Sequence, residues 1–117
     1  DLLRSRGLGD VYKRQLLAWS IENIIRNGID AIERNDGIVS ISLRKFDNDI
    51  KIRIQDNGRG IPKKDWKNIF RPGFSTKKAG WGLGLSLSSR IIEDIHGGQL
   101  KVSESSNEVG TILEISL

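Results

Sequence analysis

Three groups of residues in this chain combine residue types that could bind a nucleotide. Asn23 and Asn27 lie one helical turn apart, so a helix would place both amides on the same flank. Asp56 begins the run Asp-Asn-Gly-Arg-Gly, and residues 80–84 read Gly-Trp-Gly-Leu-Gly before a predicted helix. An amide oxygen suits Mg²⁺, a buried carboxylate can accept a hydrogen bond from a purine amino group, and free N–H groups at a helix N-terminus favour phosphate. Together these groups predict a nucleotide site.

Each group also has a simpler interpretation when it is taken alone. The two asparagines and Asp30 could form an ordinary solvated flank of a helix. An Asp-Asn-Gly tripeptide is common in turns, where the carboxylate of Asp56 would point to water. Strand alternation favours the opposite orientation, because Asp56 has the same parity as the isoleucines of residues 50–54. Hydroxyl and basic side chains at 75–78 could close over phosphates as a lid, or belong to a basic surface loop.

Composition and charge narrow the class of protein. The 117-residue chain has no cysteine, which excludes disulfides and thiolate metal sites, and no apolar run long enough to cross a bilayer. The net charge is +4, but residues 1–15 contain four basic and two acidic side chains, so the remainder carries only +2. The tryptophans are not interleaved with basic clusters, so we expect no nucleic-acid partner. A cytoplasmic location is the natural default for such a composition.

The hydrophobic pattern predicts one folded domain over residues 16–117. Residues 1–15 have no core-facing period and are interpreted as a non-native or disordered leader, with a genuine basic arm as the alternative. Helices are predicted over 16–34, 63–70 and 83–96, the last with Leu87, Ile91, Ile92 and Ile95 facing inward. Alternating residues predict two hairpins, 39–54 and 100–117, each with one dry and one wet face. We therefore expect an α+β two-layer sandwich, a mixed sheet covered on one face by about three helices.

In this order the motifs resemble the catalytic ATP-binding domain of sensor histidine kinases, within the superfamily of gyrase, chaperone and mismatch-repair ATPases. The resemblance covers residues 16–117 and rests on four blocks, at 22–27, 56–62, 69–77 and 80–87. Four blocks in sequence are far more specific than any one of them. The resemblance implies a Bergerat-type fold that here lacks the strand usually preceding the first helix.

The resemblance also implies roles for individual residues. Asn27 would coordinate Mg²⁺, with Asn23 nearby toward the phosphates, and these two are the candidate catalytic residues. Asp56 would accept a hydrogen bond from the adenine amino group. The candidate residues for binding ATP and its metal are Asn23, Asn27, Asp30, Asp56, Gly58, Gly60, Ile61, Phe70, Ser75, Thr76, Lys77, Gly80, Gly82, Leu83, Gly84 and Leu85. Catalysis would then consist of positioning and electrostatics for transfer of the γ-phosphate.

The implied function is ATP-dependent phosphorylation of a histidine in a two-component system. The acceptor would lie on an upstream dimerisation domain, and a response regulator would be the partner of the full-length protein, which could be membrane-attached. The fragment itself is expected to be monomeric. His96 precedes two glycines at a helix end and is expected to be structural, while Glu22 is expected to be a solvated charge.

Two alternatives stay open at this point. In ATP-hydrolysing relatives a glutamate takes the position of Asn23 and activates water, which an amide cannot do. A nucleotide-sensing module without catalysis would use the same binding motifs. Three positions depart from the usual pattern: Gly28 replaces an alanine, Trp81 replaces a small polar residue, and Asp30 stands where many such kinases have a basic residue.

Overall fold

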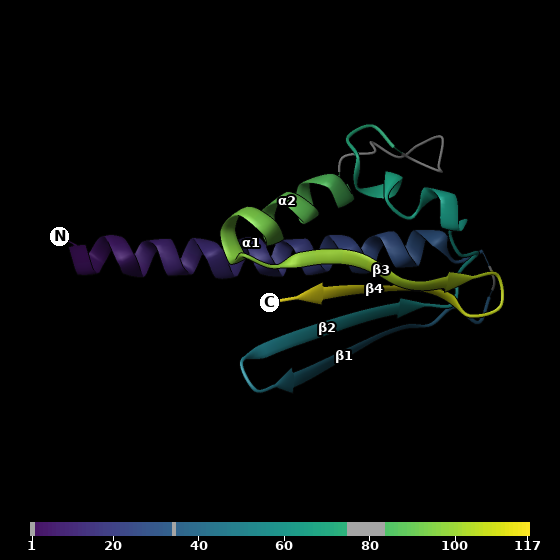
Figure 1. The fold of residues 1–117 in the computed structure, drawn as a ribbon, viewed down its shortest axis with the longest axis horizontal. Coiled ribbons are helices and arrows are strands. Elements are labelled where there is room, and N and C mark those ends of the chain that lie inside the picture. Colours follow the sequence, from purple (N-terminus) through teal and green to yellow (C-terminus); the bar gives the residue numbers. More distant parts are fainter. Residues whose placement is uncertain (1, 34, 75–83) are drawn as a thin grey trace.

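The computed structural model describes residues 2–33, 35–74 and 84–117. It contains a long helix, two short 3-10 turns, a second helix and two hairpins (Figure 1). In chain order these are α1 (Leu2–Ala31), β1 (Val39–Phe46), β2 (Asp49–Asp56), η1 (Lys63–Asp65), η2 (Asn68–Phe70), α2 (Gly84–His96), β3 (Gln99–Ser106) and β4 (Gly110–Ser116).

The sheet has four strands in the order β1-β2-β4-β3, and every neighbouring pair is antiparallel. The prediction of a mixed sheet was therefore wrong. The connection from β2 through α2 to β3 leaves those two strands parallel, but β4 inserts between them and pairs with both. Among the described strands, β1 and β3 form the two edges of the sheet.

Both α-helices pack on the same face of the sheet, which confirms the two-layer architecture (Figure 1). The core between the layers consists mainly of isoleucine, and Ile24 of α1, Ile92 of α2 and Ile115 of β4 are almost completely buried. Branched side chains pack well on a pleated surface, and alternation places every second residue of β2 and β4 against the helices. Among the described residues, no helix has the length and apolar character to span a membrane.

The first helix is longer than its apolar period predicts, since it begins at Leu2 instead of near residue 16. Residues 2–31 contain no proline, and glycines within them weaken a helix without ending it. The N-terminal part of α1 extends past the end of the sheet (Figure 1). The interpretation of residues 1–15 as a leader separate from the domain stays a prediction.

Three other expectations need correction. The predicted helix over 63–70 consists of two 3-10 turns, η1 and η2. The expected dry face of β1 is covered only at Val39, which packs against the core, because α1 lies mainly over β2 and leaves Ile41 and Leu43 more than half exposed. In α2, Leu87 is 47% exposed, while Ser88 occupies the inward position and is fully buried. A serine there is small enough for α1 and α2 to approach closely.

Candidate nucleotide site

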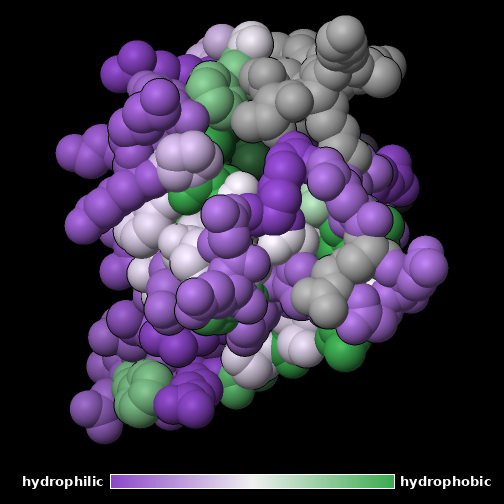
Figure 2. Space-filling view, turned by 90° about the vertical axis from the view of Figure 1, so that its right-hand side faces the viewer, coloured by the Kyte–Doolittle hydropathy of each residue, from purple (hydrophilic) through white to green (hydrophobic). Residues whose placement is uncertain are grey.

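The predicted site residues that the structure describes gather at one end of the molecule. The C-terminal half of α1, the end of β2, the loop that follows it and the N-terminus of α2 all lie in the right-hand half of Figure 1. Figure 2 looks onto this end, where hydrophilic residues dominate the surface and smaller hydrophobic areas are visible between and below them. Segments far apart in the sequence thus form one face.

Asp56 is the last residue of β2 and its side chain points toward the helices. It is only 7% exposed, and its Oδ2 lies 3.4 Å from the position that a Cβ on Gly28 of α1 would occupy. The other carboxylate oxygen, Oδ1, accepts a hydrogen bond of 2.8 Å from the N–H of Gly58. The orientation predicted from strand parity is confirmed, and the alternative of a carboxylate turned to water is wrong.

Burial perturbs the ionisation of Asp56. Desolvation raises the pKa of its carboxyl above the ordinary value, although backbone N–H groups of Gly58 and Thr111 and the charge of Arg59 act in the opposite direction. A buried carboxylate whose charged form is poorly solvated gains from any further hydrogen-bond donor. The site therefore favours a ligand that donates a hydrogen bond here.

Glycines allow the backbone to close tightly around Asp56. A Cβ on Gly58 would lie 2.6 Å from the carbonyl oxygen of Ala31, so this position requires glycine. Gly60 has a φ of +79°, and its Cβ would lie 2.5 Å from the carbonyl oxygen of Ser106. The two glycines seat the loop after β2 against α1 on one side and against the β3–β4 turn on the other.

Asn57 supports the turn that follows Asp56, and the sequence motifs did not predict this role. Its Oδ1 accepts a hydrogen bond of 2.8 Å from the N–H of Ile38, and its Nδ2 donates to the carbonyl oxygen of Asp36 at 3.0 Å. The Asn57 backbone N–H also donates to the carbonyl oxygen of Ile38 at 3.3 Å. The side chain thus ties the loop before β1 to the glycine turn.

A second supporting chain of hydrogen bonds holds Ile61. Its N–H donates to Ser105 Oγ at 2.7 Å, and that hydroxyl lies 2.7 Å from Thr111 Oγ1. The indole N–H of Trp66 donates to the carbonyl oxygen of Ile61 at 3.0 Å. The contact between Ser105 and Thr111 follows from the pairing of the two C-terminal strands, which sets these residues opposite each other.

Asn23 lies where α1 meets the N-terminus of α2. Its Nδ2 donates a hydrogen bond of 3.2 Å to Ser88 Oγ, and a Cβ on Gly84 would lie 2.6 Å from the same nitrogen. Gly84 thus lets the start of α2 approach the amide closely. Asn27 and Asp30 follow on the exposed part of α1. The helix geometry keeps all three polar residues near this end of the molecule.

The remaining predicted residues divide into two groups. Ile61, Phe70 and Leu85 are partly buried and pack against the core. The others lie outside the described residues, as does Trp81: Ser75, Thr76, Lys77, Gly80, Gly82 and Leu83. Within the described residues, no cluster of three or more His, Cys, Asp or Glu side chains could hold a metal by itself.

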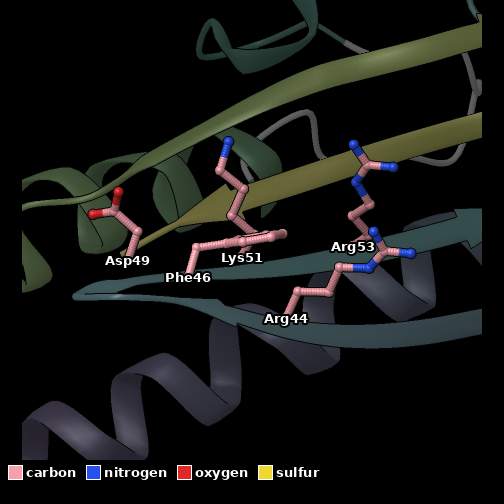
Figure 3. Close-up of a pocket in the computed structure, with 5 residues that line it drawn as sticks. All are labelled: Arg44, Phe46, Asp49, Lys51 and Arg53. Carbon is pink, nitrogen blue, oxygen red and sulfur yellow. The ribbon is translucent and has the colours of Figure 1, made fainter.

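A separate hollow of about 360 Å³ lies on the outer face of the sheet, away from Asp56. Figure 3 shows its lining residues on the β1–β2 hairpin: Arg44, Phe46, Asp49, Lys51 and Arg53. Beside it, Glu114 is buried and contacts Arg53 at 2.9 Å, Lys51 at 3.5 Å and Lys101 at 3.6 Å. Burial raises the pKa of Glu114, but the hydrogen bond from Arg53 and the neighbouring cations outweigh it, so the pKa lies below its ordinary value. We interpret this cluster as a charge network that holds the sheet together.

Comparisons with known proteins agree with this arrangement. Residues 13–117 match the family of histidine kinase-, DNA gyrase B-, and HSP90-like ATPases. Sporulation kinase C of Bacillus subtilis is 40% identical over 95 residues, covering 81% of this chain and 22% of that protein. The signal transduction histidine-protein kinase AtoS of Escherichia coli is 41% identical over 90 residues, covering 77% of this chain and 15% of that protein.

A solved structure shows the same fold. The nucleotide-free catalytic domain of histidine kinase ThkA superposes with a TM-score of 0.78 at 31% identity, covering 89% of this chain and 66% of that one. The chain spans about a fifth of the length of relatives such as sporulation kinase C. The chain belongs to the family of histidine kinase-, DNA gyrase B- and HSP90-like ATPases, and within it the chain is similar to the catalytic domains of histidine kinases.

Proposed function

We propose that this domain binds Mg-ATP between α1 and α2 and presents the γ-phosphate to a histidine on a separate, upstream dimerisation domain. The observation that carries the proposal is the buried carboxylate of Asp56 at the glycine turn. The amino group of adenine would supply the donor that this carboxylate favours. Gly58 and Gly60 let the turn that holds this carboxylate pack closely against α1 and the β3–β4 turn.

The phosphates would lie toward the N-terminus of α2. The first N–H groups of a helix have no intrahelical partner and carry partial positive charge, so they favour an anion. Asn23 lies against this helix start through its hydrogen bond to Ser88. We extend the phosphate site to Lys77, Gly80 and Gly82 from the resemblance, and these residues lie outside the described part of the chain.

The residues present fit a magnesium ion that shares its ligands with a nucleotide. Mg²⁺ usually takes one or two protein oxygens and completes its octahedron with phosphates and water. The exposed amide of Asn27 offers one such oxygen, and the described residues hold no acidic cage that would compete. Asn27 would therefore hold the metal, which neutralises negative charge on the phosphates when it is bound.

The side chain at position 23 favours phosphotransfer over hydrolysis. A water-activating residue must accept a proton, which a neutral amide does not do. The Asn23 Nδ2 also donates to Ser88, so the side chain acts as a link between the helices. Asn23, Asn27 and the helix start would orient the ATP for in-line attack by an external histidine.

The acceptor histidine must come from elsewhere. His96 is the only histidine, and it ends α2, about 18 Å along the helix from Gly84 at a rise of 1.5 Å per residue. Its Nε2 lies 3.0 Å from the carbonyl oxygen of Lys13, so the ring joins α2 to α1. We therefore assign the acceptor to the upstream domain, and a response regulator to the full-length system, because ThkA has been solved in complex with one. We also propose a cytoplasmic location for the domain, because the cycle consumes ATP.

Calorimetric titration with ATP tests the proposal. Wild type should bind ATP with Mg²⁺ present, and Asn27→Ala should weaken binding in Mg²⁺ while leaving the weaker binding in EDTA unchanged. Asn48→Ala, in the exposed turn between β1 and β2, serves as the matched control. A folded wild-type domain that shows no ATP binding would sink the proposal.

Phosphotransfer separates the remaining alternatives. Mixing the domain with a histidine-containing dimerisation domain from a relative and radiolabelled ATP should label that domain and leave His96 unlabelled. Rapid ATP turnover abolished by Asn23→Ala would identify a hydrolase instead. ATP binding without transfer to any supplied acceptor would identify a nucleotide-sensing module.

A further inference from the structure

The outer face of the β1–β2 hairpin carries a second hollow beside the one drawn in Figure 3. It has a volume of about 270 Å³ and is lined by Ser40, Ser42, Arg44, Arg53, Gln55 and Ile112. The two hollows share Arg44 and Arg53 as lining residues, so they adjoin and form one groove, which we call the hairpin groove. Residues 40–46 of β1 border it, which gives a length of about 20 Å at about 3.4 Å per residue. An extended peptide of about six residues has that length.

The hairpin groove carries more positive charge than its surroundings neutralise. Arg44, Lys51 and Arg53 line it, and among the described lining residues Asp49 at one end is the only acidic one. Glu114 contacts Lys51 and Arg53, but its single negative charge is shared among three cations. Arg44 makes no ion pair within the described part of the chain. The groove therefore keeps a surplus of positive charge.

Strand pairing places two of these cations together at a cost in stability. Arg44 and Lys51 lie directly opposite each other in the register of β1 and β2, and like charges in opposite positions destabilise a sheet. Figure 3 shows Lys51 and Arg53 extending from the same side of β2. An anion lying along the hairpin would meet all three cations and offset their mutual repulsion. The shape and charge of the groove thus favour an elongated anionic ligand.

We propose that the hairpin groove binds an extended, acidic segment of a partner protein. Alternate residues of an extended chain point to the same side, so two carboxylates about 7 Å apart would reach Arg44 and Arg53 in turn. The hydroxyl of Ser42 offers a hydrogen bond between them, and the ring of Phe46, which is 54% exposed, offers an apolar contact at one end. The groove lies on the face of the sheet opposite the helices, so this site is separate from the proposed ATP site.

Fluorescence anisotropy with a labelled peptide of eight residues, in which glutamate and threonine alternate, tests this proposal. Wild type should bind this peptide more tightly than a matched peptide with glutamine in place of glutamate. Arg44→Glu should weaken binding of the acidic peptide by about 5- to 30-fold, because an attraction between exposed charges becomes a repulsion of similar size. Lys67→Glu changes the net charge equally at an exposed residue outside the groove, and it should alter the affinity by less than about twofold.

Two measurements separate a lost contact from a lost fold. Arg44→Glu should raise the midpoint of urea denaturation, because the glutamate would face Lys51 across the strands. Ser42→Glu is a second variant, which should also weaken binding because its carboxylate would lie opposite Arg53 and take the place of the partner's. If Arg44→Glu fails to fold, Ser42→Glu decides.

Three outcomes would overturn the proposal. The first is that the acidic peptide does not bind to wild type. The second is that it binds equally to wild type and to the folded groove variants. The third is that a single-stranded oligonucleotide or a phosphatidylserine vesicle binds the groove more tightly than the acidic peptide, which would identify a nucleic acid or a membrane as the partner instead.

Discussion

Replacing Asp56 with asparagine should weaken ATP binding and stabilise the nucleotide-free domain. The carboxylate offers two acceptor oxygens, one of which already bonds to the Gly58 N–H at 2.8 Å. An asparagine offers one acceptor and one donor. Whichever way its amide is turned, either the Gly58 N–H or the purine amino group would face another donor.

The loss in affinity follows from one missing hydrogen bond to a charged group. Such a bond contributes about 1.5–3 kcal/mol, which corresponds to binding weakened by about 10- to 150-fold. The effect on stability has the opposite sign. Because folding raises the pKa of Asp56 through desolvation, the wild-type domain loses stability as the pH rises from the unfolded value of about 3.9 through the higher folded value. The asparagine that replaces it in the variant cannot ionise, so the stability advantage of Asp56→Asn should appear over that interval and persist at neutral pH.

Two assays measure these effects on the same samples. Calorimetry gives the affinity for Mg-ATP, and chemical denaturation from about pH 4 to about pH 8 gives the free energy of unfolding. Asp49→Asn, at the exposed opposite end of β2, should change neither quantity appreciably. Unaltered ATP affinity in Asp56→Asn would refute the assignment of Asp56 to the base. A less stable variant at neutral pH would refute the argument from desolvation.

Three further predictions concern the scaffold. Glu114→Gln should lower the free energy of unfolding at neutral pH by about 1.5 kcal/mol, near the lower limit for a charged hydrogen bond because the cationic partners are partly exposed. Since folding lowers the pKa of Glu114, wild type should lose this advantage over the variant as the pH falls below about 4.3. The same dependence of unfolding free energy on pH in wild type and variant, measured by denaturant titration, would contradict this prediction. Gly60→Ala should cost at least about 1–2 kcal/mol for its left-handed backbone, with a further loss from contact with the Ser106 carbonyl, so an unchanged melting temperature would show that the turn rearranges freely. Ile92→Ala should cost about 2–5 kcal/mol by urea denaturation, whereas Leu87→Ala in the same helix should cost less than about 0.5 kcal/mol, and similar losses for the two would disprove the burial difference.

Sequence periodicity predicted the parts of the fold that depend on local alternation. The burial of Ile52 and Ile54 and the inward orientation of Asp56 followed from the two-residue period of a strand. The same rule failed for Ile41 and Leu43, because alternation shows which side a residue faces and does not show whether a helix covers that side. The helical period likewise could not show which of Leu87 and Ser88 is buried, since the closeness of α1 to α2 decides which side chain fits between the two helices.

The site was predicted in part for the same reason. Motifs contiguous in sequence, such as Asp56 with its glycine turn, were recognisable because their residues act on one another locally. Their supporting contacts join distant segments: Asn23 with Ser88, and Ile61 with Ser105. No sequence spacing specifies those pairs.

The amino-acid sequence by itself determined the family and the order of the four motif blocks, and it predicted which residues could contact ATP. Only the tertiary structure decided that β4 separates β2 from β3, that Asn23 bonds to Ser88 of α2, and that Gly28 of α1 packs closely against Asp56 of β2. Residue type and local period are properties of short segments, so the sequence carries them directly. How closely a helix packs on a sheet depends on the whole core, so no short segment determines these contacts.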